Sequence, residues 1–402
     1  MDLTDAKLHS AILNDANLNA AVLNRADVGG ATFINADLSG AMMDGTYLIS
    51  ATSRFGWPDP ADFTGAKLVG ATLRNVSFGG VEGFRELRYF HVAFNNADMS
   101  GATLVNVQDF RFGGGLSTAN FTNAIMAGND LTGTDLTSVA MAGANLAGAN
   151  LANTNLTNAS LTNATLAGAT LTGTNLTGAA LAGVNLSDVD LRNTTFSPNS
   201  DLNLTGAILD RANLSGKVFG SPTVLGPNFD NASLIGTNLA GTNCYYCGFV
   251  GANLTGANLS NAALVDSNLT NANFSNATTD GVNWFRTTLI GVNLSGTNLS
   301  GGNFANRDLS NSTLIGAVLT NANLADANLT NANLTNATLT GADLSGVTWS
   351  NTTCPDGSKT NTGCSGTQAL LVTSSPPVSG AQSSDATIRY VDNDIHTDYL
   401  PW

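Results

Sequence analysis

The feature that most constrains the fold of this chain is a period of five residues. Between residues 121 and 171 a large apolar side chain stands at every fifth position, as at Leu146 and Leu151. A small residue such as Ala144 lies two positions earlier, Asn or Asp often follows it, and Gly or Asn is common two positions after the large residue. The unit reads A-[N/D]-L-x-[G/N]. It recurs with few slips from Leu3 to Trp349, so chance is excluded.

A five-residue period fits neither an amphipathic helix nor a regular strand. In an extended segment, residues two apart point to the same side, so the small and the large residue face the same way. Gly and Asn tolerate positive φ and favour turns. Each unit is therefore predicted to be a very short strand followed by a bend, and four bends close a square coil. Residues 20 apart are expected to stack, which pairs Phe229 with Phe249, Trp284 with Phe304 and Phe121 with Met141.

This pattern resembles the pentapeptide-repeat family over residues 1–349. The resemblance implies an all-β fold, a right-handed quadrilateral β-helix of about 16 coils, which at the usual strand spacing would be roughly 75 Å long. Each coil of such a solenoid contacts only its neighbours, so residues 1–349 are expected to form one domain despite their length.

The repeat is interrupted at residues 49–62, 79–93, 105–120 and 197–203, and the three longer breaks all lie in the first 120 residues. Loops on a rigid scaffold often carry function, which makes these breaks a candidate interaction surface. The favoured interpretation is that they are tolerated insertions whose aromatic side chains pack against the solenoid, and the interaction surface is the alternative. The candidate interaction residues are Trp57, Arg85, Arg88, Tyr89, Phe110 and Arg111.

Beyond residue 349 the sequence changes character. Residues 350–372 are predicted to form a disulfide-closed loop, because Cys354 and Cys364 flank a Pro-Asp-Gly turn and no nearby His completes a zinc site. Residues 373–402 are a linker rich in Ser, Pro and Gly, followed by an apolar tail that needs a surface to dock on, either its own solenoid or a neighbour. The candidate docking residues are Tyr390, Ile395, Tyr399 and Trp402.

The other two cysteines, Cys244 and Cys247, occupy a large inward position and the next small inward position. We expect both to be apolar core residues. A disulfide between them is the less favoured alternative.

Catalysis is not expected. The three histidines, His9, His91 and His396, are far apart in sequence, and a stack of short coils keeps such residues apart in space, so no catalytic triad is predicted. Most carboxylates stand in an outward position, as at Asp190 and Asp343, which is typical of solvated surface groups. No glycine-rich phosphate loop precedes a helix. The chain is therefore predicted to be no enzyme and to need no metal or cofactor.

The charge pattern bears on one alternative function. The best-known members of the family resembled here mimic DNA, bind DNA gyrase and confer quinolone resistance. This chain has a net charge of −14, but residues 121–349 hold only 12 acidic and 5 basic residues, a net of −7. Such sparse charge makes a poor copy of a duplex field. The DNA-mimic function therefore stands as an alternative, and nucleic acid is not expected as a partner.

The favoured hypothesis is a non-enzymatic structural or binding rod that self-associates, as a component of a fibre or a surface layer. The repeat begins at Leu3, so an open coil end would expose unpaired backbone groups that template another chain. The partner would be a second copy or another protein, contacted at the coil ends or through the tail. A further alternative is an ice-binding or surface-adsorbing protein, because Thr recurs at the same place in successive coils, as at Thr157 and Thr177 and again at Thr320 and Thr340.

The compartment is predicted from composition. No run of about 18 apolar residues that would cross a membrane is present, and the chain starts without the basic and apolar regions of a signal peptide. Low charge, many Asn, Thr and Ser residues and the Cys354/Cys364 pair favour an extracellular or cell-surface setting. A cytoplasmic location is the alternative.

Overall fold

The computed structural model describes residues 1–50, 59–78, 92–107, 116–197, 202–219, 221 and 223–364. The chain divides into two compact units, Met1–Ala369 and Leu370–Trp402, and every described residue belongs to the first.

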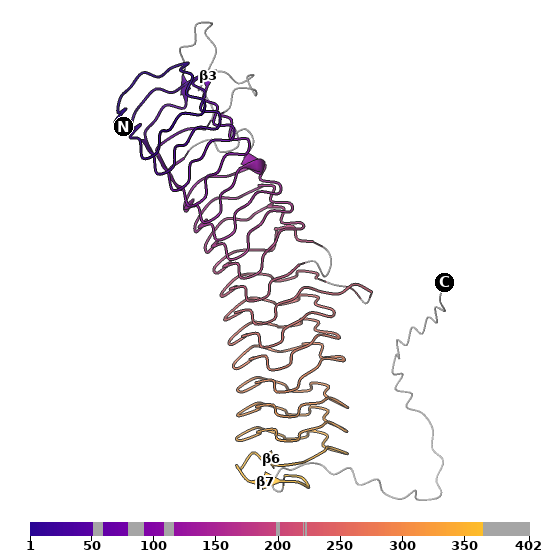
Figure 1. The fold of residues 1–402 in the computed structure, drawn as a ribbon. Coiled ribbons are helices and arrows are strands. Elements are labelled where there is room, and N and C mark those ends of the chain that lie inside the picture. Colours follow the sequence, from indigo (N-terminus) through magenta and orange to yellow (C-terminus); the bar gives the residue numbers. More distant parts are fainter. Residues whose placement is uncertain are drawn as a thin grey trace, which may run out of the picture. The chain divides into compact units, whose positions relative to one another are not determined.

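The first unit is a stack of coils joined by parallel β-bridges (Figure 1). In its regular stretches each bridge joins residues 20 positions apart, as in Asn145–Thr165 and Asn253–Asn273. In the regular stretches each five-residue repeat contributes a single bridging residue, and turn residues separate one bridging residue from the next. The prediction of 20-residue coils made of very short strands and bends is thus confirmed in these stretches.

Within the described residues, longer strands form at a few places only. The strands β1 (Met42–Asp44), β4 (Thr72–Arg74) and β5 (Thr103–Val105) make a three-stranded parallel sheet in the order β1-β4-β5. The described segments also contain two antiparallel pairs and one short 3-10 helix. These elements are β2 (Ile49–Ser50) with β3 (Asp59–Pro60), β6 (Thr352–Thr353) with β7 (Lys359–Thr360), and η2 (Leu116–Thr118).

A regular set of backbone hydrogen bonds holds the coils together. The N–H of the large inward residue donates to the next coil, as Leu146 N–H does to the Thr165 carbonyl at 2.7 Å. The residue before it donates to the preceding coil, as Asn145 N–H does to Ala124 at 2.9 Å. Within each repeat, a turn closes with a bond such as Ala149 N–H to Leu146 at 3.0 Å. The polar backbone of a five-residue repeat is therefore paired without long strands.

The core is a column of large side chains surrounded by small ones, and both inward positions are buried along most of the unit. Phe229 and Phe249 stack with ring centroids 5.0 Å apart and planes 7° apart, while Trp284 and Phe304 are tilted at 5.9 Å. Both predicted pairs are confirmed. Asn120 bridges Ala140, which places the following residues of the third pair one coil apart as well.

The corners explain the recurrence of Gly and Asn. The residue two positions after the large one adopts a left-handed conformation, with φ of 64° at Gly148 and 57° at Asn153. Only Gly adopts this region without strain, and Asn and Asp tolerate it better than other residues.

The bridges also locate the insertions. Thr32 pairs with Asp62 and Asp62 with Ala93, so these coils are about half as long again as a regular one, and β2 and β3 lead the first insertion out of the coil. No break was expected after residue 204, yet Asn203 pairs with Asn228 rather than with Thr223. The five extra residues include a local antiparallel bridge between Ser221 and Val224. An insertion of one repeat length leaves the phase unchanged, so phase alone does not reveal it.

Candidate functional site

The six candidate residues of the interaction loops (Trp57, Arg85, Arg88, Tyr89, Phe110 and Arg111) lie outside the described residues, and so do the four of the tail (Tyr390, Ile395, Tyr399 and Trp402). What the structure describes is the base of the first loop, where Ile49 pairs with Pro60 and Ser50 with Asp59. The two ends of the coil stack are described in detail and differ from each other.

At the N-terminal end, the first coil is bonded on one side only. Lys7, Ile12 and Asn17 form bridges to the second coil. In later coils the residue at the same repeat position also forms a bridge to the preceding coil, through its own backbone N–H and C=O groups. For example, the Asp27 N–H donates to the Ala6 carbonyl at 2.9 Å, and the Asp27 carbonyl accepts from the Leu8 N–H at 2.7 Å. Among the described residues nothing pairs with the corresponding backbone groups of Lys7, Ile12 and Asn17. We call these three residues the N-terminal edge.

The same end exposes apolar surface. Ile12 is 80% exposed and Met1 is 76% exposed. The inward residues Leu3, Leu8 and Leu13 are only partly buried, although their equivalents in the second coil, such as Leu23, are fully buried. Free backbone groups and apolar side chains therefore occur together at this end.

At the C-terminal end, a closed loop packs against the last coil. The coil ladder continues to the Asn333–Thr353 bridge, and β6 then turns back through β7. Cys354 and Cys364 lie at disulfide distance, with sulfur atoms 2.06 Å apart, and Cys354 is buried. The Asn351 N–H donates to the Asn361 side chain at 2.7 Å, which holds the loop across the end of the stack.

The remaining cysteines correct one expectation. Cys244 and Cys247 are buried in the core as predicted, but their sulfur atoms are 1.94 Å apart and form a disulfide, which was the less favoured alternative. The corner between them, where Tyr246 has a φ of 53°, turns the chain so that a large inward position and the next small one face each other. A spacing of three residues across one corner permits this pair, and the turn of the corner brings the two sulfur atoms together.

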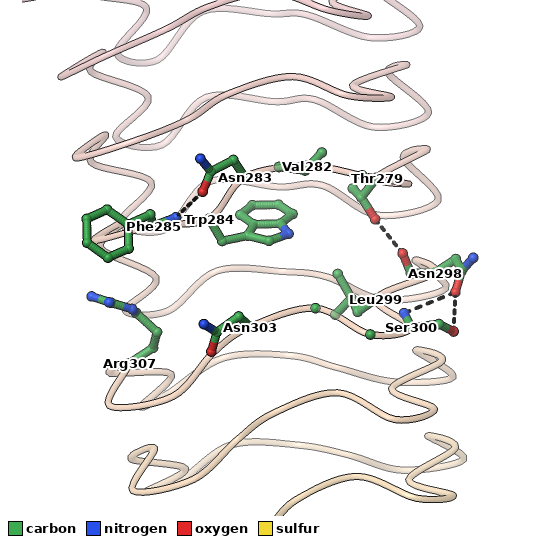
Figure 2. Close-up of a pocket in the computed structure, with 13 residues that line it drawn as sticks. Thr279, Val282, Asn283, Trp284, Phe285, Asn298, Leu299, Ser300, Asn303 and Arg307 are labelled. Carbon is green, nitrogen blue, oxygen red and sulfur yellow. Dashed lines mark hydrogen bonds between the residues drawn. The ribbon is translucent and has the colours of Figure 1, made fainter. Parts of the chain in front are cut away.

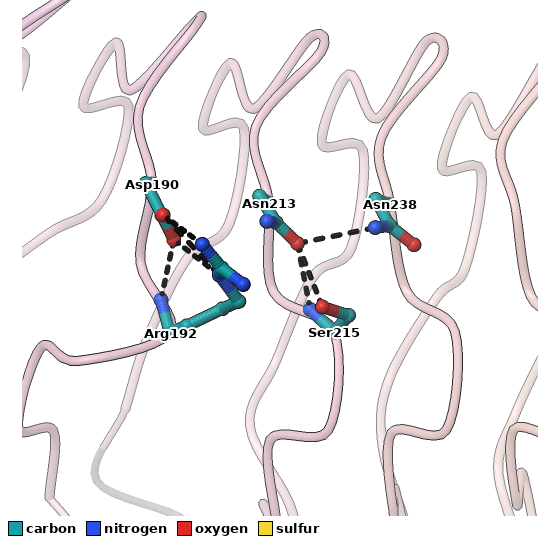
Figure 3. Close-up of polar contacts among 5 residues, drawn as sticks. All are labelled: Asp190, Arg192, Asn213, Ser215 and Asn238. Atoms are coloured by element: carbon teal, nitrogen blue, oxygen red, sulfur yellow. Dashed lines mark hydrogen bonds and ion pairs between the residues drawn. The ribbon is translucent and has the colours of Figure 1, made fainter.

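The carboxylates act as turn acceptors on the outside of the coils. The Asp343 carboxylate accepts the Ser345 N–H at 3.0 Å, and this backbone hydrogen bond lowers the pKa of Asp343. Asp190 accepts from the Arg192 guanidinium at 2.7 Å, and this side-chain hydrogen bond lowers the pKa of Asp190 (Figure 3). Asn fills the same place in other coils, as Figure 3 shows for Asn213, which accepts from Ser215 and from Asn238 of the next coil. Asp and Asn therefore serve one structural purpose.

Metal-ligating side chains are dispersed in the described part of the chain. Within it, no group of three or more His, Cys, Asp or Glu residues is placed to hold a metal ion. His9 belongs to the first coil, while His91 and His396 lie outside the described residues. Among the residues that the structure describes, no helix is long and apolar enough to span a membrane.

Comparison with known proteins identifies the family. The family model described as pentapeptide repeats matches residues 2–40, 141–178, 159–197, 228–271, 247–283, 267–306 and 308–346, which together cover more than half of the chain. The chain therefore belongs to the pentapeptide-repeat family, whose fold is a right-handed quadrilateral β-helix and whose members are generally non-enzymatic structural or binding proteins. No curated protein matches it.

Three solved structures illustrate its similarities. HetL of the cyanobacterium Nostoc sp. strain PCC 7120, involved in heterocyst differentiation regulation, is 23% identical over 86% of this chain and 92% of its own, with a TM-score of 0.20. Rfr23 of the cyanobacterium Cyanothece 51142 is 33% identical over 28% of this chain and 62% of its own, with a TM-score of 0.18. QnrB1, a plasmid-mediated fluoroquinolone resistance protein, is 21% identical over 55% of this chain and 88% of its own, with a TM-score of 0.20.

Proposed function

We propose that this chain is a non-enzymatic structural protein that self-associates through its N-terminal edge. The observation that carries the proposal is the joint exposure of backbone and apolar groups there. Lys7, Ile12 and Asn17 each offer a backbone N–H and C=O group, and the apolar side chain of Ile12 is 80% exposed beside these groups. An exposed edge of this kind is a template for pairing with another chain.

The differing ends of the stack favour a particular geometry. The loop closed by Cys354 and Cys364 packs on the last coil, so it obstructs stacking of a first coil onto the end of another copy. Two first coils present the same surface to each other, which suits an isologous contact and a closed dimer. Growth into a fibre or a surface layer would need a second contact, and the predicted tail residues between 373 and 402 are the candidates for it.

The two alternative functions gain no support from the described surface. In residues 121–349 three of the five basic residues pair with aspartates, as Arg211 does with Asp188 at 2.6 Å, which dilutes an already sparse acidic field. The Thr157 hydroxyl donates to Asn155 at 2.6 Å, so this hydroxyl is already committed within the chain and is not a free donor to ice.

For the compartment we infer an oxidising setting, outside the cell or at its surface. Two cysteine pairs at disulfide distance support this inference, because such bonds are rare in reducing compartments.

The test measures the oligomeric state by light scattering and electron microscopy across a range of concentrations. We expect a concentration-dependent dimer, and Ile12→Lys should weaken it by about tenfold or more, since Lys is a typical guard of exposed edges. Ile208→Lys is the matched control, because Ile208 occupies the same repeat position in an interior coil and is 38% exposed. Monomers at every concentration, or equal effects of the two variants, would overturn the proposal.

A further inference from the structure

One junction between described coils lacks the regular backbone bonds on three of its four faces. The segments 278–290 and 298–310 are both fully described and lie in successive coils. Following the regular pattern, the N–H groups of Thr279, Trp284 and Leu289 would donate to carbonyls of the next coil, as Leu259 N–H does to Thr278 at 2.8 Å. None of these three bonds is made, and the bridges that would join 278 to 298, 283 to 303 and 288 to 308 are absent as well. We call this junction the seam.

The seam lacks the backbone ladder on three faces, which we call open, and keeps it on the fourth, which we call closed. Two side-chain hydrogen bonds cross one open face, from the Thr279 hydroxyl to the Asn298 carbonyl and from the Asn298 amide to the Asp280 carboxylate at 2.8 Å. On the closed face, the Gly291 N–H donates to Ser310 at 2.8 Å and the Leu294 N–H to Thr313 at 2.7 Å, and Asn293 bridges Thr313. The coils before and after the seam keep their bonds, as Phe304 N–H does to Asn323 at 2.7 Å. Smaller interruptions occur elsewhere, since no bridge joins Thr170 to Asp190 or Thr195 to Val218, but bridges on other faces of those junctions remain, as in Asn175–Thr195 and Asp190–Asn213.

Two polar side chains at inward positions account for the opening. Thr279 stands where the adjacent coils have Leu259 and Leu299, and its hydroxyl donates to the Asn298 carbonyl at 2.7 Å. That carbonyl is the one its own N–H would otherwise bond. Arg307 stands at a small inward position, where the next coil has Ala327, and its guanidinium lies 5.9 Å from the centre of the Phe285 ring. A side chain of this length does not fit among the small inward residues.

The aromatic core is displaced at the same place. Trp284 fills a position that is usually Leu, and its ring centroid is 5.9 Å from that of Phe304. The Phe304 ring occupies the space beside Gly302, where an added Cβ would lie 2.6 Å from it. Between the two coils remains a cavity of about 280 Å³ (Figure 2). Figure 2 shows Thr279 and Asn298 on one side of this cavity and Phe285 and Arg307 on the other.

A second place in the stack shows the same principle independently. Lys217 also stands at a small inward position, over the Phe196 ring at 5.4 Å. Its ammonium group donates to the Thr194 carbonyl. By analogy with Asn213 N–H, which donates to Val189, that carbonyl would otherwise accept the Val218 N–H. A polar side chain at an inward position thus takes over a carbonyl from the backbone ladder in both cases.

We propose that the seam is a joint at which the coil stack bends and first separates. In a solenoid, stability is close to a sum over coils and the junctions between neighbours, so the junction with the fewest bonds opens most readily. The closed face around Asn293 and Thr313 is the hinge line, and the three open faces move apart about it. The contact of Trp284 with Phe304 keeps the apolar core continuous while the joint is at rest.

Hydrogen exchange of the full-length chain, followed at residue resolution, tests the joint. We expect the amides of Trp284, Leu289 and Asn303 to exchange at least about tenfold faster than those of Phe304, Leu309 and Asn323, because exchange reports local opening. Equal exchange rates in the two sets would overturn the proposal.

A closing variant adds the converse test. Thr279→Leu with Arg307→Ala restores the residue types of the neighbouring coils, and it should slow the exchange of the seam amides toward that of the comparison set. Each single substitution is examined as well, so that the outcome does not depend on the double variant folding. Arg286→Ala is the matched control, because it removes an arginine that pairs with Asp266 outside the seam. Unchanged exchange in all closing variants, or an equal effect of Arg286→Ala, would contradict a joint set by Thr279 and Arg307.

Discussion

The side-chain oxygen of Asn276 lies 2.5 Å from the point that a Cβ atom on Gly296 would occupy. The two residues stand at the same corner of successive coils. The Asn fills the space that the Gly leaves open, and the same relationship joins Asn261 to Gly281 at 2.5 Å. At these two corners the preceding Asn therefore adds a steric constraint to the positive φ. Where Asn follows Asn, as at Asn311 and Asn331, the two side chains form a hydrogen bond at 3.2 Å instead.

This relationship predicts unequal costs for two similar substitutions. Gly316 occupies the same corner one coil after Gly296, with φ of 65° against 68°, but nothing lies within 4 Å of its added Cβ. Gly316→Ala should cost about 1 kcal/mol of unfolding free energy, from the left-handed backbone alone. Gly296→Ala should cost about 0.5 kcal/mol more, because the Asn276 side chain must rotate away from the added Cβ. Chemical denaturation measures both.

A compensating change provides the control. Asn276→Gly removes the overlapping oxygen, so it should recover most of the additional loss in the Gly296→Ala background and none of the loss from Gly316→Ala. Equal destabilisation by the two alanine variants would show that only φ matters at these corners.

The two disulfides should differ in their access to reductant. Cys244 and Cys247 are 2% and 1% exposed within the core, whereas Cys364 lies in the partly exposed terminal loop. Under native conditions, a mild reductant and an alkylating reagent should label Cys354 and Cys364 first, and Cys244 and Cys247 only with denaturant. Peptide mass spectrometry of the unreduced chain identifies both crosslinks. Simultaneous labelling of all four residues would contradict this order.

Lys217 predicts a specific pH dependence. Burial lowers the pKa of its ammonium group from the ordinary value of 10.5, only partly opposed by Asp190. Between the lowered folded-state pKa and 10.5 the unfolded chain binds more protons than the folded one, so the contribution of Lys217 to stability rises with pH there. Denaturation midpoints of the wild type relative to Lys217→Met should increase from neutral pH toward pH 10.5. A constant difference between the two proteins would refute the burial argument.

The threonine columns predict no activity on ice. Thr157 and Thr177 donate their hydroxyl protons to Asn155 and Asn175, each at 2.6 Å. Hydroxyls oriented by such bonds are not free donors to a lattice of water. We expect no measurable thermal hysteresis from the purified chain at any concentration. A clear hysteresis gap that is lost in Thr157→Val and Thr177→Val together would revive the ice-binding hypothesis.

Much of the coil geometry followed from residue types. The stacking of Phe229 on Phe249 was predicted from their places one coil apart, because side-chain volume and the positive φ of Gly and Asn leave few ways to fold a five-residue unit. The insertion beside Ser221 was missed, since its length equals one repeat. The Cys244–Cys247 disulfide was disfavoured, because the number of residues between two cysteines says little about how a corner orients them.

By itself, the sequence determined the repeat unit, the 20-residue coil and the inward and outward positions, since these depend on the local preferences of a few neighbouring residues. Only the tertiary structure decided which backbone groups stay unpaired. Thr279, Arg307 and Lys217 look in the sequence like minor departures from the repeat, and their effect arises between coils. The side chains of Thr279 and Lys217 compete with a backbone amide for a carbonyl of the neighbouring coil, and Arg307 lies over the Phe285 ring. The open edge at Ile12 and the seam at Trp284 are both properties of that pairing between coils.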